Sequence, residues 1–476
     1  MKSFSKPFLP FWIISFATML ALTVSSLVQD GMFMDAMLYT SVSRNLSLGL
    51  GSFWFPYFDP WNVIGISSFH EQPPLGFGIQ SLFFKVLGDH IFVERVYTFF
   101  TLCVTAGLII VLWNQIFRKD IQYRVMGWLP VLLWITIPVC FWSYSNNMHE
   151  NTMGIFILLS ILVMYRCLQS ETLWSGYWIL AGLFICLAAL TKGIPGFFPI
   201  GFPFLYWLFI REHSFKRMAL QTGLLLCTIL IVGLLLYWYP PSRESLSIYL
   251  FKRAFARIHS IHSVDSRFFI LFRLLSELIP AFCFTALIFL ISKIKKIEFI
   301  LTGYRKTAFL FLATGISGSL PLMLTMVQNG FYFVPALPYF GLAFAILNVA
   351  PIYALILKLK TSVQNYLNIT SLVLLCGVAV FIYSKIGHTV RDQAMVSDIH
   401  LIGKSVLAFS SFEAEPAVYQ NSPLACYLVR YYNISLNVSD TNRYYLGTKN
   451  ESVVSKMPLK KMDLPLQLFD LYQRER

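Results

Sequence analysis

The chain has 476 residues, of which 57% are apolar and only 13% are charged. Soluble domains carry roughly 25% charged residues, so this composition excludes an ordinary soluble protein and indicates a membrane protein. The aromatic content of 17% excludes a disordered chain, and the eight cysteines lie almost all inside apolar runs, which excludes a disulfide framework.

The net charge of +14 has two interpretations. It could indicate nucleic-acid binding, but in a membrane protein an excess of Lys and Arg marks cytoplasmic loops and contacts with lipid phosphates. We therefore expect membrane lipids, and no nucleic acid, as partners of the basic residues.

Eleven segments resemble membrane-spanning helices, which need about 20 mostly apolar residues. No small-residue cleavage site follows the first of them, so we interpret it as a membrane anchor and not as a signal peptide. The sequence therefore predicts an all-α polytopic membrane protein. The predicted spans are residues 9–28, 91–114, 126–143, 153–169, 176–191, 194–210, 218–239, 278–292, 307–326, 333–357 and 365–384.

The positions of the basic residues predict the orientation of these spans. When the N-terminus is placed inside, the inner turns carry most Lys and Arg residues, as the positive-inside rule requires. Three long segments then face outside, namely loops of residues 29–90 and 240–277 and a tail of residues 385–476. We predict a transmembrane catalytic domain of residues 1–384 and a small extracytoplasmic α/β domain of residues 385–476, which shows no nucleotide-binding glycine pattern.

The first outer loop contains two carboxylates just beyond the first span, Asp30 and Asp35. The apolar residues after Asp35 follow a helical spacing, which places Asp35 near a helix start, where the helix dipole stabilises an anion. An ionised carboxylate at a membrane–water boundary is suited to act as a general base. A helix cap is the alternative interpretation of Asp35. Further along the loop, His70-Glu71-Gln72 precedes a double proline and indicates a rigid turn at the membrane surface.

Other polar residues fall on the same predicted outer face. Glu150 opens the fourth span, Lys192 lies in a tight turn between two spans, and Tyr332 begins the tenth. Individually they could be a capped helix end, a Lys reaching lipid head groups and an interfacial Tyr. Together, carboxylates and cations on one face suit transfer from a lipid phosphate, with a base for the incoming hydroxyl and cations for the leaving phosphate.

The outer loop of residues 240–277 breaks the positive-inside rule, since it is rich in Arg and Lys. Its stretch Glu244 to His259 has apolar residues near helical spacing, which predicts an amphipathic helix with a basic face that includes Arg253. This helix could bind anionic head groups or hold a lipid-linked phosphate, and the sequence leaves both open.

These motifs resemble the GT-C superfamily of polyprenyl-phosphate-sugar-dependent glycosyltransferases, especially family 39, which includes protein O-mannosyltransferases and the lipid A aminoarabinose transferase. The resemblance covers about residues 10–345. It departs from the family at Gln72, where relatives have a Lys that helps bind the donor phosphate, and at Ala36, where many have Glu. The matching residues are Asp35, Tyr39 and Arg44, then His70-Glu71-Gln72-Pro73, Glu150, Leu190-Thr191-Lys192-Gly193, and Tyr332 with Pro335.

The resemblance implies a GT-C fold with extracytoplasmic interfacial helices and an inverting sugar transfer from an undecaprenyl or dolichyl phosphate. The acceptor would be a hydroxyl on a lipid, a glycan or a protein. The roles implied are catalysis by Asp35, Asp30 and Glu150, donor-phosphate binding by Lys192, Tyr332, Arg253 and Arg44, and substrate orientation by Tyr39, His70, Glu71 and Gln72.

The carboxylates and His70 fit no tight metal-ligand motif, so we assign no metal, although some relatives use a divalent ion. A transporter or flippase of lipid-linked sugars is the alternative function, but no internal repeat supports it. The lack of a eukaryotic retention signal favours a bacterial inner membrane with an extracytoplasmic site.

Overall fold

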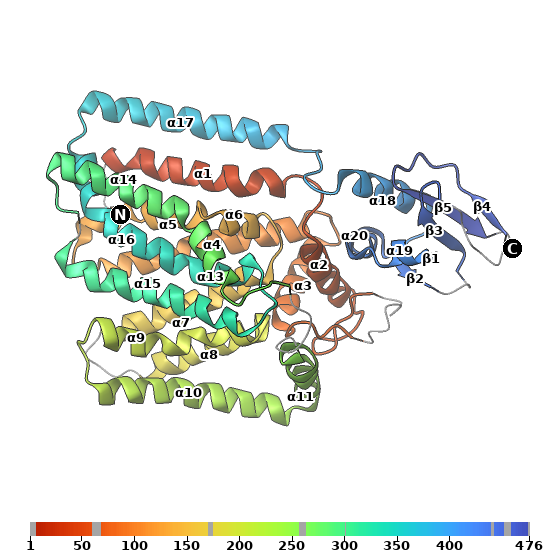
Figure 1. Ribbon diagram of the computed structural model, residues 1–476, viewed down its shortest axis with the longest axis horizontal. Coiled ribbons are helices and arrows are strands. Elements are labelled where there is room, and N and C mark those ends of the chain that lie inside the picture. Colours follow the sequence, from red (N-terminus) through yellow and green to blue (C-terminus); the bar gives the residue numbers. More distant parts are fainter. Residues whose placement is uncertain are drawn as a thin grey trace. The chain divides into compact units, whose positions relative to one another are not determined.

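A computed structural model describes residues 6–59, 68–169, 175–256, 263–299, 301–438, 442–451 and 458–474 of the chain (Figure 1). Backbone contacts divide the chain into two compact units. The membrane unit comprises Met1–Ser25, Phe99–Ser145 and His149–Ser384, and the loop–tail unit comprises Ser26–Thr98, Asn146–Met148 and Lys385–Arg476.

The membrane unit is built from helices, many of which run roughly parallel to one another in Figure 1. Two of them, α1 and α4, also contribute residues to the loop–tail unit. The α-helices are α1 (Leu9–Leu27), α4 (Val93–Ile116), α5 (Trp128–Ile135), α6 (Pro138–Tyr144), α7 (His149–Leu168), α8 (Ser175–Lys192), α9 (Phe202–Phe209), α10 (Phe215–Trp238), α11 (Pro240–Ser247), α13 (Phe269–Glu277), α14 (Ile279–Lys295), α15 (Arg305–Ser319), α16 (Leu337–Leu357) and α17 (Thr361–Ser384). Short 3-10 segments are η1 (Lys6–Phe8), η2 (Ile121–Met126), η3 (Ile194–Gly201), η5 (Thr302–Tyr304), η6 (Leu320–Leu324) and η7 (Gly330–Ala336), and η4 (Ile248–Ala254) is a π-helix.

The helices long and apolar enough to cross a membrane number seven among the described residues, or nine if each of two bent pairs is one span. Two further predicted spans correspond to the shorter apolar segments Gly176–Lys192 and Ile194–Phe209. Each of the eleven predicted spans therefore has a helical counterpart, but the count of eleven complete spans is not confirmed.

The predicted span 126–143 is wrong as a single straight helix. The helices Ile121–Ile135 and Pro138–Tyr144 meet at 90°. Ile137 adopts an extended conformation and Pro138 begins the next helix, because a proline supplies no N–H to continue the preceding one. A smaller bend of 47° separates Phe269–Glu277 from Ile279–Lys295, so the predicted span 278–292 is only the second part of a bent pair.

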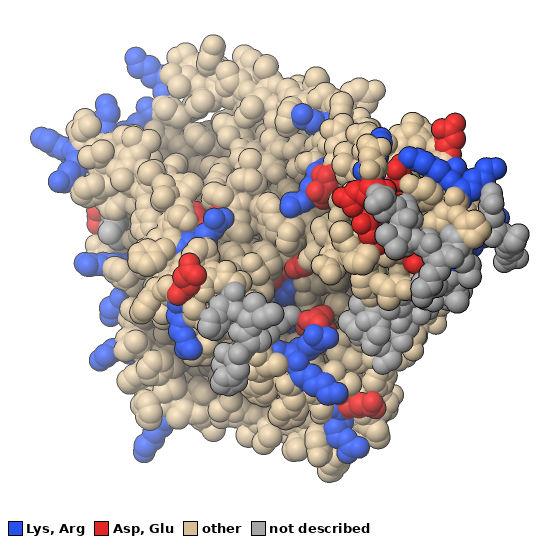
Figure 2. All heavy atoms as spheres, turned by 45° about the vertical axis from the view of Figure 1, so that its right-hand side comes forward, with Lys and Arg blue, Asp and Glu red and all other residues tan. Residues whose placement is uncertain are grey.

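The packing of the membrane unit distinguishes central from peripheral helices. Helix α16 contacts α5, α14 and α15, and 72% of the most apolar stretch of Gly330–Leu357 is buried. By contrast, only 11% of the most apolar stretch of α17 and 17% of the most apolar stretch of α10 are buried. Apolar side chains exposed on such helices are expected where lipid replaces water. Most of the surface drawn in Figure 2 carries neither acidic nor basic side chains.

The loop–tail unit combines the first predicted outer loop with the C-terminal tail. Helix α2 packs against α3 and α20, and α18 packs against α20. The sheet has the order β2-β1-β3-β5-β4, with β1 parallel to β2 and β3, and β5 antiparallel to β3 and β4. This sheet confirms the small C-terminal α/β domain predicted in the fold class. The elements are α2 (Met34–Ser47), α3 (Leu75–Leu87), α18 (Gln393–Ser405), β1 (Ser411–Ala414), α19 (Pro416–Tyr419), α20 (Ser422–Tyr432), β2 (Ser435–Asn437), β3 (Tyr444–Thr448), β4 (Leu459–Lys461) and β5 (Phe469–Arg474).

Candidate functional site

The carboxylate of Asp35 lies in the first turn of α2 and is half-buried. Phe33, not Asp35, is the residue that caps this helix, so the capping interpretation of Asp35 is wrong. The approach to the helix is fixed by two hydrogen bonds, since the Phe33 N–H donates to the Asn146 side chain at 2.9 Å and the Met32 N–H donates to the Tyr427 hydroxyl at 3.1 Å. The helix dipole favours the anionic form of a carboxylate at this position.

Two of the predicted orienting residues, Tyr39 and Gln72, are brought together. The Gln72 amide donates a hydrogen bond to the Tyr39 hydroxyl, and both side chains are buried. His70 is also buried, and its Nε2 atom lies 2.6 Å from the Ser68 hydroxyl. Glu71, between His70 and Gln72 in the sequence, is half-buried. The turn before the double proline therefore packs onto α2, which carries Asp35 one helical turn before Tyr39.

The membrane unit joins two other predicted site residues in an ion pair. The Lys192 ammonium lies 3.1 Å from the Glu150 carboxylate, and the two side chains are 11% and 1% exposed. Lys192 ends α8 and Glu150 lies in the first turn of α7. Each charge is thus at the helix end whose dipole stabilises it. The pair holds the Lys192 ammonium at the C-terminal end of α8.

The turn after Lys192 requires glycine. Gly193 has φ +88°, and a Cβ atom there would overlap the hydroxyl of Tyr249. Tyr249 comes from the π-helix η4, and its hydroxyl lies 3.5 Å from the Lys192 carbonyl oxygen. The predicted interfacial helix begins as α11 and continues as this π-helix, whose wider turn seats Tyr249 on the Lys192 turn. The end of the predicted helix, from residue 257, lies outside the described residues.

We expect Gly193→Ala to destabilise the protein strongly, because it combines a left-handed backbone with a steric overlap. The expected loss is at least about 1–3 kcal/mol, visible as a lower unfolding temperature of the purified protein. Gly201→Ala is the matched control, since a Cβ atom at Gly201 meets nothing within 4 Å. Equal unfolding temperatures for the two variants would contradict this account of the turn.

The remaining predicted phosphate ligands of the membrane unit lie on short irregular helices. Arg253 is half-buried in η4, four residues after Tyr249. Tyr332 is half-buried in η7, and its hydroxyl lies 3.2 Å from the Asn329 side-chain nitrogen.

Arg44 is fully buried, which differs from the expectation that it binds a donor phosphate. Its guanidinium donates to the carbonyl oxygens of Arg430 and Val429 at 2.6 and 2.9 Å and to the side chain of Asn433. It also lies 3.8 Å from the Asp89 carboxylate. Arg44 therefore satisfies the carbonyl groups at the C-terminal end of α20, which is a structural role in the contact between loop and tail.

Asp30 is also used by the tail. Its carboxylate accepts hydrogen bonds from the Tyr431 hydroxyl and, at 2.6 Å, from the Gly31 N–H, and it lies 2.7 Å from His400 Nε2 and 3.5 Å from the Arg95 guanidinium. Burial raises the pKa of this carboxyl, but the hydrogen bonds from His400 and Tyr431 and the charge of Arg95 outweigh it and lower the pKa from 3.8 to about 2. Asp30 is thus an ionised structural carboxylate.

The lowered pKa of Asp30 predicts acid sensitivity of the loop–tail unit. A carboxyl group whose pKa is lower in the folded state stabilises that state at pH values above its unfolded pKa of 3.8. This contribution of about 2 kcal/mol is lost as the pH falls towards 2. We expect Asp30→Asn to reduce the pH dependence of unfolding between pH 4 and pH 2, measured by intrinsic fluorescence. An unchanged slope in this pH range would refute the assignment.

Within the seven described stretches of the chain, no three His, Cys, Asp or Glu side chains are arranged to hold a metal ion.

The chain resembles a known family in sequence and known structures in fold. Residues 71–238 match the sequence model of a family described as dolichyl-phosphate-mannose-protein mannosyltransferase. No curated protein matches the chain. The structure of ArnT from Cupriavidus metallidurans bound to undecaprenyl phosphate aligns over 96% of both chains, with a TM-score of 0.64 and 13% identity. The apo form of that ArnT aligns over 96% of both chains, with a TM-score of 0.63 and 12% identity. The chain has a GT-C fold.

The GT-C fold confirms the predicted fold class and resemblance. The described helices that are long and apolar enough to cross a membrane make this chain an integral membrane protein. The family match supports a glycosyltransferase, and hence an enzyme. The roles of its individual residues and its domain boundaries stay predictions.

Several residues that contact the loop of Asp35 were not predicted as site residues from the sequence. They include His400, Tyr431 and Arg430 in the tail. A signal existed for Glu94 and Arg95, because charged residues at the start of a predicted span need partners. The tail residues gave no comparable signal, since their partners are hundreds of positions away.

Proposed function

We propose that this protein is an inverting glycosyltransferase that moves a sugar from a polyprenyl phosphate to an acceptor hydroxyl. The observation that carries the proposal is a fold shared over 96% of the chain with an ArnT whose structure was determined with undecaprenyl phosphate bound. The family match over residues 71–238 points to the same class of donor, because that family is described by a dolichyl-phosphate sugar.

Asp35 is the proposed general base. It takes the proton from the acceptor hydroxyl as that oxygen attacks the anomeric carbon of the sugar. The bond between this carbon and the phosphate oxygen breaks, and the polyprenyl phosphate leaves with the electron pair. Attack from the opposite side inverts the anomeric configuration. The half-buried carboxylate in the first turn of α2 supports this role, since the helix dipole favours the anionic form that a general base needs.

Lys192 is the proposed cation for the departing phosphate, with Tyr332 and Arg253 as further ligands. Glu150 then holds the Lys192 ammonium in place, as their distance of 3.1 Å supports. A cation fixed before reaction stabilises developing charge without reorganisation. Gln72 cannot supply the positive charge of the Lys found in relatives. In this chain we therefore expect Lys192 to supply more of the positive charge that stabilises the departing phosphate. Tyr39, His70, Glu71 and Gln72 are proposed to orient the substrate from around α2.

The acceptor is proposed to be a hydroxyl on a lipid, a glycan or a protein. The reaction is placed on the extracytoplasmic face of a bacterial inner membrane, where the positive-inside rule puts Asp35 and Lys192.

The test uses purified protein in nanodiscs with undecaprenyl-phosphate sugars supplied one at a time, together with cell-envelope extracts as acceptors. We expect release of free undecaprenyl phosphate by the wild type with one of these sugars. Binding of the lipid without release would favour a flippase or carrier of lipid-linked sugars, and absence of binding would refute the proposal.

A further inference from the structure

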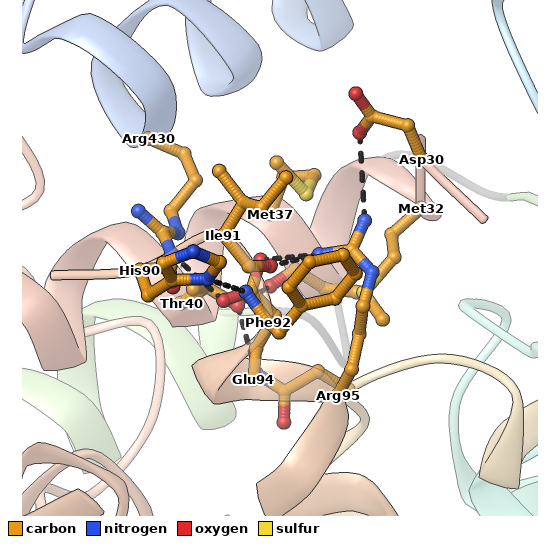
Figure 3. A network of polar contacts seen from close by, with 12 residues as sticks. Asp30, Met32, Met37, Thr40, His90, Ile91, Phe92, Glu94, Arg95 and Arg430 are labelled. Carbon is orange, nitrogen blue, oxygen red and sulfur yellow. Dashed lines mark hydrogen bonds and ion pairs between the residues drawn. The ribbon is translucent and has the colours of Figure 1, made fainter. Parts of the chain in front are cut away.

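A chain of alternating charges runs through the loop–tail unit, as Figure 3 shows in part. Asp30 lies 3.5 Å from Arg95, Arg95 lies 2.9 Å from Glu94, and Glu94 lies 2.8 Å from Arg430. The chain continues from Arg430 to Asp89 at 3.0 Å and from Asp89 to Arg44 at 3.8 Å. Except for Asp89, whose side chain is 39% exposed, these side chains are largely buried.

The two ends of this series of charged residues flank α2. Asp30 lies five residues before Asp35, and Arg44 lies in the last turn of the helix. Arg44 binds the C-terminal carbonyl groups of α20, and Asp30 binds His400 of α18 and Tyr431 of α20. The helix that carries Asp35 is therefore held at both ends by helices of the tail.

The backbone between Asp30 and α2 is held by the tail as well. The Val390 N–H donates to the Asp30 carbonyl at 2.9 Å, and the Asp30 N–H donates to the His388 carbonyl at 2.9 Å. Gly31 has φ +78°, and a Cβ atom there would lie 2.6 Å from the Arg391 carbonyl oxygen. The Tyr427 hydroxyl donates to the Met32 carbonyl at 2.6 Å. Asp30, Gly31 and Met32 thus lie directly against residues of the tail.

His400 is the centre of the contact at Asp30. An ionised carboxylate only accepts hydrogen bonds, so His400 Nε2 carries the hydrogen that is donated to Asp30. The Nδ1 atom lies 2.9 Å from the Tyr432 hydroxyl, and the ring stacks on Tyr431. The imidazole is therefore fixed in orientation from three sides.

We propose that the tail positions the general base: His400 and Tyr431, through Asp30, together with α20, through Arg44, set the place of Asp35. This inference rests on the proposed function. Asp30, His400 and Tyr431 are then positioning residues, and the tail determines the rate of transfer without binding the donor.

The variants for the test separate a positioning role from general damage. His400→Leu with Tyr431→Phe removes two hydrogen bonds to Asp30, whereas His400→Gln keeps a donor near that carboxylate. Lys404→Ala is the matched control, because Lys404 is exposed one turn further along α18. Asp30→Asn changes the same contact from its other side and is the second variant if the double variant does not fold in nanodiscs.

Two measurements are made on each variant of the full-length protein in nanodiscs. The first is kcat and the donor KM for release of undecaprenyl phosphate. The second is hydrogen–deuterium exchange of residues 31–37, which needs no substrate. We expect the double variant to lower kcat about tenfold or more with a donor KM within about twofold of wild type, since small displacements of a reacting group are costly. Hydrogen–deuterium exchange of residues 31–37 should become faster in the double variant. The single variant His400→Gln should keep most of the wild-type kcat.

The outcomes distinguish this inference from the proposed function. An unchanged kcat in the folded double variant, a rise in donor KM that accounts for the loss, or an unchanged exchange rate would each overturn the positioning role. If the wild type releases no undecaprenyl phosphate, the proposed function fails. In that case the exchange measurement still decides whether the tail holds α2.

Discussion

Replacing Asp35 by Asn is expected to lower sugar transfer by about 10²–10⁴-fold while the protein stays folded, because the amide cannot accept the proton of the acceptor hydroxyl. The substitution keeps the size of the side chain and its place in the first turn of α2, where Asp35 is half-buried and does not cap the helix. The measurement is the rate of undecaprenyl phosphate release in nanodiscs at saturating donor and acceptor.

The control for this prediction is Asp463→Asn, which makes the same chemical change at an exposed position of the tail. It should leave the rate unchanged. Donor binding by Asp35→Asn should also stay close to wild type, since the base acts on the acceptor. Normal turnover by Asp35→Asn would show that another group removes the proton.

Replacing Lys192 by Met is expected to cost stability and activity together. The Glu150 carboxylate is 1% exposed and loses the cation at 3.1 Å, and an uncompensated buried charge costs about 3–5 kcal/mol. The departing phosphate also loses its proposed cation, so transfer should be abolished. Unfolding temperature and undecaprenyl phosphate release measure the two effects separately.

The double variant Lys192→Met with Glu150→Gln separates these two consequences. Removal of both charges should restore most of the stability, because no buried ion is left without its partner. Transfer should remain absent if Lys192 binds phosphate, and it should return if the pair is only structural. Lys358→Met, at an exposed position after α16, controls for the loss of one positive charge from the protein.

The sequence by itself was sufficient for the membrane-spanning segments and for the local setting of the main candidate residues. Apolar runs and charged turns are local properties, and they placed a helix in each predicted span. Helical spacing after Asp35 placed it at a helix start, and the Lys192-Gly193 pair indicated the turn in which Gly193 has a positive φ.

Only the tertiary structure decided which charged groups meet. The partners of Asp30 and Arg44 lie in the tail, and Lys192 pairs with Glu150 across two helices. The 90° bend at Ile137 also appeared only in the structure, since a Pro near the middle of an apolar run is compatible with either a kinked or a broken span. Complementary charges far apart in the chain leave no periodic or local pattern. Their pairing is fixed by the packing of helices, which brings α2, α18 and α20 together in one unit.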